Sequence, residues 1–410
     1  MTGVGSNGDA AMKEDEMQAL LDRQRAAFAA ARPESLDVRR DRLRRLIALL
    51  KESQDALAAA MSADFGHRSR EQSLLTDVLP AVGLANHCLK HLRRWARPER
   101  RAPMAPLGLI GARAEVRHEP KGVVGIVSPW NYPVGLTMAP LAQALAAGNR
   151  AMIKPSEFTP ETSVLMQALL ASRFSPEEVA VVTGGAEAGQ SFCALPFDHL
   201  LFTGATAVGR KVAQAAAAQL TPLTLELGGK SPAIIAADAN MARTAERIAL
   251  GKLMNAGQTC VAPDYLLVPE GREEAVASAI AAATAAMYPT MAANPDYCAI
   301  INARHLERLQ ALVADAVARG ARAIEVNPAG EDFAQSNSGK LPLTLLLGVD
   351  DAMAVMGQMD CVLLIAAAEK TTAKELDICE REAASQSNIL GVVLNKCRYM
   401  GPDYGYSYYS

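Results

Sequence analysis

The feature that most constrains this chain is a regular alternation of strand-like and helix-like segments that begins near residue 120. The first segment, Val123–Val127, is a continuous apolar run of the kind that forms a strand buried on both faces of a sheet. The segments that follow are expected strands at 150–154, 179–182, 199–202 and 222–226, and expected helices at 134–147, 159–172, 186–194 and 207–219. This alternation predicts an α/β fold with a doubly wound parallel sheet, whose ligands bind beyond the carboxyl ends of the strands.

A second alternating series runs from about 233 to 350 and predicts another α/β unit. Its expected strands lie at 233–236, 264–268 and 322–326, with helices near 241–255, 272–287 and 303–319. Before the first series, the segments 16–63 and 71–95 carry helical periodicity and predict a helical hairpin packed on a larger body. Ala114–His118 alternates like a half-exposed strand, and residues 1–15 are expected to be a disordered tail.

Composition and charge exclude several classes of protein. The 410 residues suffice for two or three domains, and the formal net charge of -3 argues against a nucleic-acid-binding face. The basic stretch Arg93–Arg101 is expected to be the solvated end of a helix. The N-terminus is polar and acidic, unlike a signal peptide, and no apolar run is long enough to span a membrane. These observations predict a cytoplasmic protein with neither a membrane nor a nucleic-acid partner.

The 7 cysteines are an odd number, are widely spaced and form no CxxC pair. Such usage argues against a disulfide framework or a zinc site and favours reduced thiols. Most lone cysteines are inert buried residues, and six of these are interpreted in that way. The exception is Cys260, at the end of GQTC, which closes an expected helix before the strand Tyr265–Val268.

Polar residues follow two of the expected strands. The prolines of Ser128–Pro133 (SPWNYP) hold a rigid loop from which Asn131 presents an amide, and the alternative is a packed turn around a core tryptophan. In the next loop (KPSE), Lys154 and Glu157 suit the hydroxyls of a ribose, and the alternative is a surface loop closed by a salt bridge.

Two further strand ends carry small residues or a carboxylate. The small residues of Phe202–Gly209 (FTGATAVG) would let a diphosphate approach the backbone N–H groups at the start of a helix, although many tight strand-to-helix turns look similar. In Glu226–Pro232 (ELGGKSP), two glycines make the backbone flexible. Glu226 can therefore reach the expected ligand site beyond the carboxyl ends of the strands. A solvated glutamate with no function is the alternative.

In this order, PWNYP, KPSE, FTGATAVG, ELGGKSP and GQTC resemble the motifs of the aldehyde dehydrogenase superfamily over about residues 20–355. The segments GQTCVAPDYLLV and NPDYCAIINARH are similar to the coniferyl-aldehyde dehydrogenase branch. The resemblance implies oxidation of an aldehyde, aromatic in that branch, to the carboxylic acid through a cysteine thiohemiacetal and a thioester. It implies Cys260 as the nucleophile, Glu226 as the general base and Asn131 as an oxyanion donor, with no metal.

The resemblance also implies a nicotinamide cofactor. Glu157 favours NAD, because the 2′-phosphate of NADP would face its carboxylate, although NADP is possible. The residues that match the family's cofactor contacts are Trp130, Lys154, Ser156, Glu157, Gly204, Ala205, Thr206, Gly209 and Leu227.

The implied organisation is an NAD-binding domain at 16–226, which includes the helical hairpin and a bridging β segment near 107–120, and a catalytic domain at 227–356. After Met356 the sequence departs from the family, which would continue with an EEIFGP-type motif, so the fold is expected to be C-terminally truncated. The pattern of residues 357–410 instead predicts a β-α-β piece that is foreign to this family, with a tyrosine-rich tail. Its expected elements are a strand at Cys361–Ala366, a helix at Thr372–Ala384 and a strand at Asn388–Asn395. This piece resembles the carboxyl end of bacterial exopolysaccharide tyrosine autokinases.

Alternative functions remain open from the sequence. The chain could be a truncated dehydrogenase that binds nucleotide with little turnover, or an acylating or esterase-type enzyme that uses the same nucleophile without hydride transfer. The expected partner is a small-molecule aldehyde. A homodimer is expected if residues 357–410 replace the subunit-pairing element, and otherwise a monomer or an aggregate.

Overall fold

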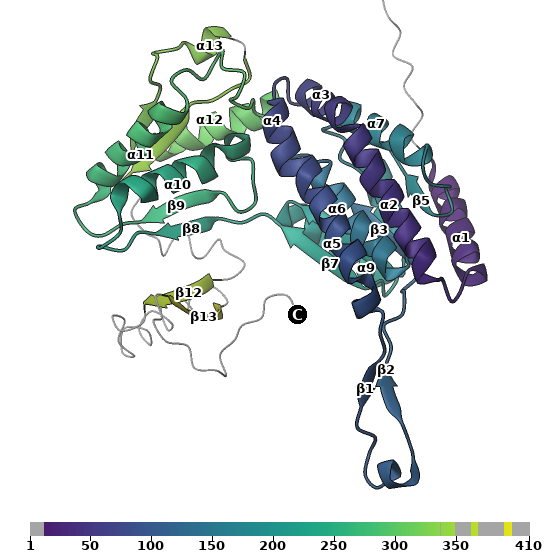
Figure 1. Cartoon of the computed structure of the whole chain (residues 1–410). Coiled ribbons are helices and arrows are strands. Elements are labelled where there is room, and N and C mark those ends of the chain that lie inside the picture. The colour runs from purple at the N-terminus through teal and green to yellow at the C-terminus, as the bar shows by residue number, and fades with distance from the viewer. Residues whose placement is uncertain (1–11, 337, 349–361, 368–388, 396–410) are drawn as a thin grey trace, which may run out of the picture.

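The structure is a computed structural model that describes residues 12–336 and 338–348, and the backbone of 362–367 and 389–395. Two lobes are visible in Figure 1, joined by the segment between β7 and β8. The first lobe contains α1 (Glu14–Ala30), α2 (Leu36–Glu52), α3 (Gln54–Asp64), α4 (Arg70–Ser73), η1 (Leu74–Val78), α5 (Leu79–Trp95), β3 (Val123–Val127), α6 (Gly135–Ala147), β4 (Arg150–Lys154), α7 (Pro160–Ala171), β5 (Val179–Val181), α8 (Ala186–Ala194), β6 (His199–Gly204), α9 (Thr206–Ala218) and β7 (Leu223–Leu227). The second contains β8 (Ser231–Ile234), α10 (Met241–Leu253), η3 (Met254–Gly257), β9 (Pro263–Leu267), α11 (Glu273–Met287), α12 (Ala303–Ala318), β10 (Arg322–Val326), α13 (Phe333–Ser336) and β11 (Leu343–Leu347).

The first lobe is built on a five-stranded sheet with the order β5-β4-β3-β6-β7. Every pair of neighbours in it is parallel, which confirms the predicted doubly wound sheet. The chain adds β4 and β5 on one side of β3 and then returns to add β6 and β7 on the other. The direction in which successive strands are added to the sheet reverses between β3 and β6. In open parallel sheets, ligands bind at such a point.

Helices cover both faces of this sheet, so its strands β3 and β4 are buried along nearly their whole length. On β4, Ala151 and Ile153 pack with α2, α5 and α6 in one hydrophobic cluster, whereas Met152 packs with α1, α8 and α9 in another. Successive side chains of a strand point to opposite faces, which explains this division. The continuous apolar run at Val123–Val127 has the same cause, because β3 is buried on both faces.

The helical region before the sheet has more breaks than a hairpin of two helices. The expected segment 16–63 is divided into α1, α2 and α3. Pro33 lies between α1 and α2, and the hydroxyl of Ser35 accepts a hydrogen bond from the Val38 N–H at 3.3 Å, which caps the new helix. The second expected segment consists of α4, the π-helical turn η1 and α5.

The second lobe has the expected helices but two small sheets. β8 and β9 pair in parallel, and β10 and β11 pair antiparallel. The observed α10, α11 and α12 match the helices expected at 241–255, 272–287 and 303–319, although α10 ends two residues early. β11 was not expected from the sequence.

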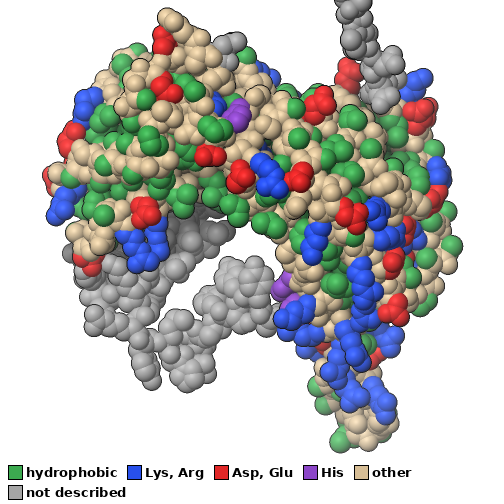
Figure 2. Space-filling model, turned by 45° about the horizontal axis from the view of Figure 1, so that its top comes forward, with side chains coloured by type: hydrophobic (Ala, Val, Ile, Leu, Met, Phe, Trp, Pro, Cys, Tyr) green, Lys and Arg blue, Asp and Glu red, His purple; other side chains and the backbone are tan. Residues whose placement is uncertain are grey.

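A two-stranded arm projects from the first lobe (Figure 1). It is formed by β1 (Glu99–Arg101) and β2 (Ala114–Val116), which pair antiparallel, with the short helix η2 (Leu107–Ile110) between them. The basic stretch Arg93–Arg101 therefore ends in a strand and is only partly a helix end. Figure 2 shows Lys and Arg side chains gathered over this arm and its base.

The residues described beyond 357 form two strands. β12 (Val362–Ala367) and β13 (Ile389–Asn395) pair in parallel, as a β-α-β piece requires. The expected helix at 372–384, the change of sequence at 356–357 and the tyrosine cluster at 404–409 lie outside the described residues, as does most of the N-terminal tail. Within the described part of the chain, no helix combines the length and the apolar character needed to cross a membrane.

Candidate active site

Four of the motifs lie at the carboxyl ends of neighbouring strands. Val127, the last residue of β3, pairs with Lys154, the last residue of β4. On the other side, Gly204 at the end of β6 pairs with Leu227 at the end of β7, and Glu226 is in register with Thr203. Because the strands are parallel, all four ends meet at one edge of the sheet.

The KPSE loop after β4 holds a buried cation. Lys154 is 3% exposed, and its Nζ donates a hydrogen bond to the carbonyl of Pro155 at 2.8 Å. Burial lowers the pKa of Lys154, while the nearby Glu157 acts in the opposite direction. Ser156 is also buried, whereas Glu157 is exposed. A buried ammonium beside an exposed carboxylate is a suitable pair for a ligand that carries hydroxyl groups.

The start of α9 has the features of an anion site. Its N-cap residue, Ala205, supplies no side-chain cap, so the first N–H groups, from Thr206 onward, have no side-chain acceptor at the cap position. A Cβ atom at Gly209 would lie 2.7 Å from the Cδ2 of Leu227, and one at Gly204 would lie 2.6 Å from the ring of Phe202. Both glycines therefore permit close packing of this turn, and the site fits the diphosphate of a dinucleotide.

Cys260 differs from the other cysteines that the structure describes. It is exposed, whereas Cys88, Cys193 and Cys298 are buried. Burial raises the pKa of the Cys88 thiol, and it raises that of Cys193 and of Cys298 to about 11. A neutral, buried thiol is a poor nucleophile. Among the described cysteines, Cys260 is thus the thiol that a substrate can reach.

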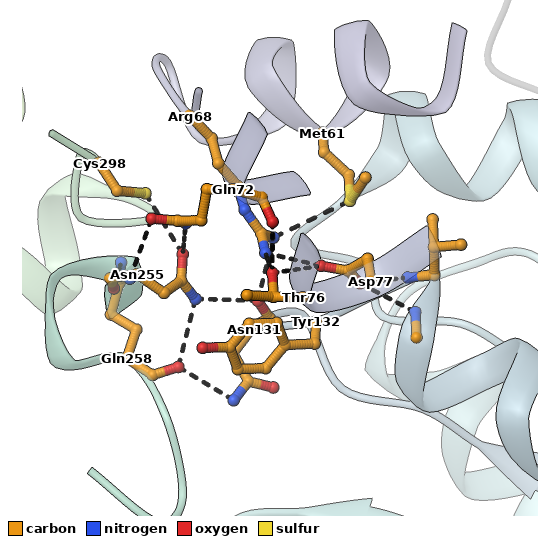
Figure 3. A network of polar contacts seen from close by, with 12 residues as sticks. Met61, Arg68, Gln72, Thr76, Asp77, Asn131, Tyr132, Asn255, Gln258 and Cys298 are labelled. Atoms are coloured by element: carbon orange, nitrogen blue, oxygen red, sulfur yellow. Dashed lines mark hydrogen bonds and ion pairs between the residues drawn. The ribbon is translucent and has the colours of Figure 1, made fainter. Parts of the chain in front are cut away.

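The segment that carries Cys260 contacts the loop after β3. The side-chain amide of Asn131 donates a hydrogen bond to the carbonyl of Gln258 at 3.0 Å, and the hydroxyls of Tyr132 and Thr259 are 2.5 Å apart. These two contacts join the lobes immediately before the thiol, and Figure 3 shows the one between Asn131 and Gln258. An amide has two N–H bonds, and the contact with Gln258 uses one of them.

The turn that follows Glu226 also approaches Cys260. A Cβ atom at Gly229 would lie 3.3 Å from the Cys260 carbonyl oxygen. The Nζ of Lys230 forms an ion pair with Asp264 at 2.9 Å, which ties this turn to the start of β9. Glu226 itself is exposed on β7. The predicted base and the predicted nucleophile therefore belong to two segments in contact.

Trp130 has surroundings that sequence reasoning did not predict. Its ring lies 6.3 Å from that of Phe65 and 5.2 Å from that of His305, measured between centroids. It is half-buried between the helical layer of the first lobe and α12 of the second. The cofactor contact expected for this tryptophan stays a prediction, and the ring contacts observed here also join the two lobes.

A buried ion pair beneath Asn131 was also missed. Arg68 and Asp77 have side chains with 0% exposure, and their Nη2 and Oδ2 atoms are 2.6 Å apart. Arg68 donates from Nη1 to the backbone carbonyl of Asn131 at 3.1 Å. The second carboxylate oxygen of Asp77 accepts from the N–H groups of Val134 and Gly135 at 3.1 and 2.8 Å. The pair thus supports the Asn131 loop at Asn131 itself and where the loop enters α6 (Figure 3).

Comparison with known proteins agrees with this geometry. A sequence model of the aldehyde dehydrogenase family matches residues 8–359. A probable coniferyl aldehyde dehydrogenase of Caulobacter vibrioides is 52% identical over 83% of this chain and 70% of its own length. A coniferyl aldehyde dehydrogenase of a Pseudomonas species (strain HR199) is 47% identical over 87% of this chain and 73% of its own. A substrate-bound structure of Staphylococcus aureus AldH superposes with a TM-score of 0.78 and 28% identity, covering 92% of this chain and 85% of that one.

The chain belongs to the aldehyde dehydrogenase family. It has the fold of that family and is an oxidoreductase of the aldehyde-oxidising class.

Proposed function

We propose that the protein oxidises an aromatic aldehyde of the coniferyl type to the carboxylic acid, with NAD as the preferred cofactor. The observation that carries this proposal is the accessible thiol of Cys260. This residue follows the contact of Asn131 with Gln258, and its backbone carbonyl lies against the turn after Glu226. The substrate class is supported by the two relatives whose names state coniferyl aldehyde.

In this reaction the Cys260 thiolate attacks the aldehyde carbon and forms a thiohemiacetal. The negative charge that develops on the aldehyde oxygen is stabilised by the amide of Asn131 and the backbone N–H of Cys260. A nicotinamide cofactor would supply the hydride acceptor here, and loss of the hydride from the substrate carbon would leave a thioester on Cys260. Glu226 then takes a proton from water, and the hydroxide releases the acid.

The cofactor would lie at the carboxyl edge of the sheet. Lys154 and Glu157 suit the adenosine ribose, with Ser156 beside them, and the start of α9 suits the diphosphate. Glu157 would repel the 2′-phosphate of NADP, which is the physical reason to prefer NAD. The other proposed contacts are Trp130, Gly204, Ala205, Thr206, Gly209 and Leu227.

The test is an assay of NADH formation with coniferyl aldehyde, and then with an aliphatic aldehyde of similar size. We expect faster turnover of the aromatic substrate and a lower KM for NAD than for NADP. Hydrolysis of an activated ester without NADH formation would instead favour an esterase. Nucleotide binding without turnover would favour the alternative of a truncated dehydrogenase that only binds nucleotide. The similar proteins do not support that alternative.

Three further expectations stay predictions. The cytoplasmic location and the oligomeric state rest on the sequence alone. The resemblance of residues 357–410 to tyrosine autokinase termini likewise rests on sequence pattern, and no kinase activity is proposed, because the phosphate-binding loop of that family is missing from the sequence.

A further inference from the structure

We propose that Asn255 is a positioning residue that fixes the Asn131 amide relative to Cys260. The inference rests on the proposed role of Asn131 as an oxyanion donor and adds a residue that no sequence motif indicated. Asn255 lies in η3, three residues before Gln258, and is fully buried.

The Nδ2 atom of Asn255 bridges the two loops that must meet. It donates to the backbone carbonyl of Asn131 at 2.9 Å and to the backbone carbonyl of Gln258 at 3.3 Å. The Asn131 side chain donates to the same Gln258 carbonyl at 3.0 Å. Asn255 therefore holds the backbone of the oxyanion donor and the acceptor of its side chain at once (Figure 3).

The surroundings of Asn255 fix the orientation of its amide. Its Oδ1 accepts from the Nε2 of Gln72 at 3.2 Å and from the thiol of Cys298 at 3.3 Å, and its backbone N–H donates to the Oε1 of Gln72 at 3.1 Å. A flipped amide would set its oxygen against two carbonyl oxygens and its nitrogen against two donors. Only the observed orientation satisfies all four neighbours.

The backbone at this position also favours asparagine. Asn255 has a φ of 53°, in the left-handed region, which asparagine and glycine enter more easily than other residues. The next residue, Ala256, has a φ of 51°. This turn ends the helical path after α10 and directs the chain toward Cys260. Glycine can adopt the same backbone conformation but has no side-chain amide. Asn255→Gly therefore keeps the turn and removes the hydrogen bonds to Asn131 and Gln258.

The expected consequence falls on the transition state. A shift of the Asn131 amide weakens its contact with the developing oxyanion but leaves the surfaces that bind aldehyde and NAD in place. Losing one oxyanion donor costs about 10²–10³ in kcat, so displacement of the amide is expected to cost on the order of 10² at most. KM for the aldehyde and Kd for NAD stay near the wild-type values.

The test is a double-mutant cycle on the full chain, with Asn131→Ala, Asn255→Asp and the double variant. Asn255→Asp keeps the shape and the backbone preference but replaces the bridging donor by an acceptor. If Asn255 acts through Asn131, its substitution has little further effect once the amide is gone, so the double variant stays within about threefold of Asn131→Ala in kcat. Asn255→Gly serves as the second variant if Asn255→Asp fails to fold.

Two measurements separate positioning from loss of structure. Alkylation of Cys260 by iodoacetamide forms no oxyanion, so its rate should stay within about threefold of wild type in the folded Asn255 variants. Asn240→Asp is the matched control, because the Asn240 side chain only caps α10 by accepting from Arg243 N–H at 3.1 Å, and aspartate caps equally well.

The outcomes are distinct. A double variant whose loss equals the product of the two single losses, or a slowed alkylation in every Asn255 variant, overturns the positioning role. An unchanged kcat in folded Asn255→Asp and Asn255→Gly, with a lowered kcat in Asn131→Ala, overturns this inference alone. An unchanged kcat in Asn131→Ala overturns the oxyanion assignment, and the positioning role with it.

Discussion

The carboxyl edge of the sheet and the buried contact between the lobes are built in opposite ways. At the edge, four of the five strands end in a short continuous motif, and the parallel pairing of the strands brings those motifs together. At the contact, single residues far apart in the chain, such as Arg68, Asn131 and Asn255, meet through hydrogen bonds. The carboxyl edge of the sheet supplies groups that can touch a ligand. The buried contact between the lobes holds one of those groups, Asn131, in place.

The difference is also one of burial. Cys260, Glu226 and Glu157 are exposed, so a ligand can reach them directly, although Lys154 and Ser156 at the edge are buried. Arg68, Asp77 and Asn255 are each at most 1% exposed. Substitution at the edge should therefore change the chemistry with little effect on folding, and substitution in the buried contact should affect folding, catalysis or both.

The largest effect is expected at the exposed thiol of Cys260, in the second lobe. Cys260→Ala should lower kcat for aldehyde oxidation by at least about a thousandfold, because the other cysteines that the structure describes are buried and cannot form the thioester. NAD affinity, measured by the quenching of protein fluorescence, and Tm should both stay close to wild type. Turnover above that limit would mean that another residue is the nucleophile.

Arg68→Met should give the largest loss of stability. It leaves the fully buried carboxylate of Asp77 without its partner, which costs about 3–5 kcal/mol. The control is Lys230→Met, whose ion pair with Asp264 is about half exposed on the lysine side and should contribute at most about 1 kcal/mol. Urea unfolding followed by circular dichroism measures both. Equal losses would show that burial does not distinguish the two pairs.

Glu226→Gln should separate the two halves of the reaction. The variant keeps the shape of the side chain but cannot take a proton from water, so we expect thioester hydrolysis to slow by about 10²–10⁴. The first turnover needs no such base, and a pre-steady-state burst of NADH should survive. If the burst disappears while NAD binding is normal, Glu226 has a different role.

The smallest effect concerns acid stability. Burial disfavours the charge on Glu178, but hydrogen bonds from Arg45 and Arg42 outweigh it and lower its pKa from 4.5 to about 2. A lowered carboxyl pKa contributes stability that is present above the unfolded value and is lost as the pH falls through the folded value. Wild type should exceed Glu178→Gln in Tm at neutral pH, and the gap should close between about pH 4.5 and 2. A gap that stays constant over this range would contradict the assignment.

The sheet and its edge could be predicted because the information is local. The apolar run of β3, the turn residues and the motif after each strand are all continuous in the sequence. The buried contact could not, because nothing near Arg68 or Asp77 indicates that they pair or that they support Asn131. For the same reason the expected helix to residue 255 was too long: Asn255 and Ala256 are left-handed, and contacts with Gln72 and Asn131 hold Asn255 there.

One measurement tests the central claim, that Cys260 carries the acyl group, most directly. Glu226→Gln is mixed with NAD and coniferyl aldehyde, quenched with acid after the burst, digested, and analysed by peptide mass spectrometry. Slow hydrolysis should leave the acyl thioester on the peptide that contains Cys260, in an amount equal to the NADH formed in the burst. An unmodified Cys260 peptide after a full burst, or an acyl group on a peptide with Cys88, Cys193 or Cys298, would contradict the account.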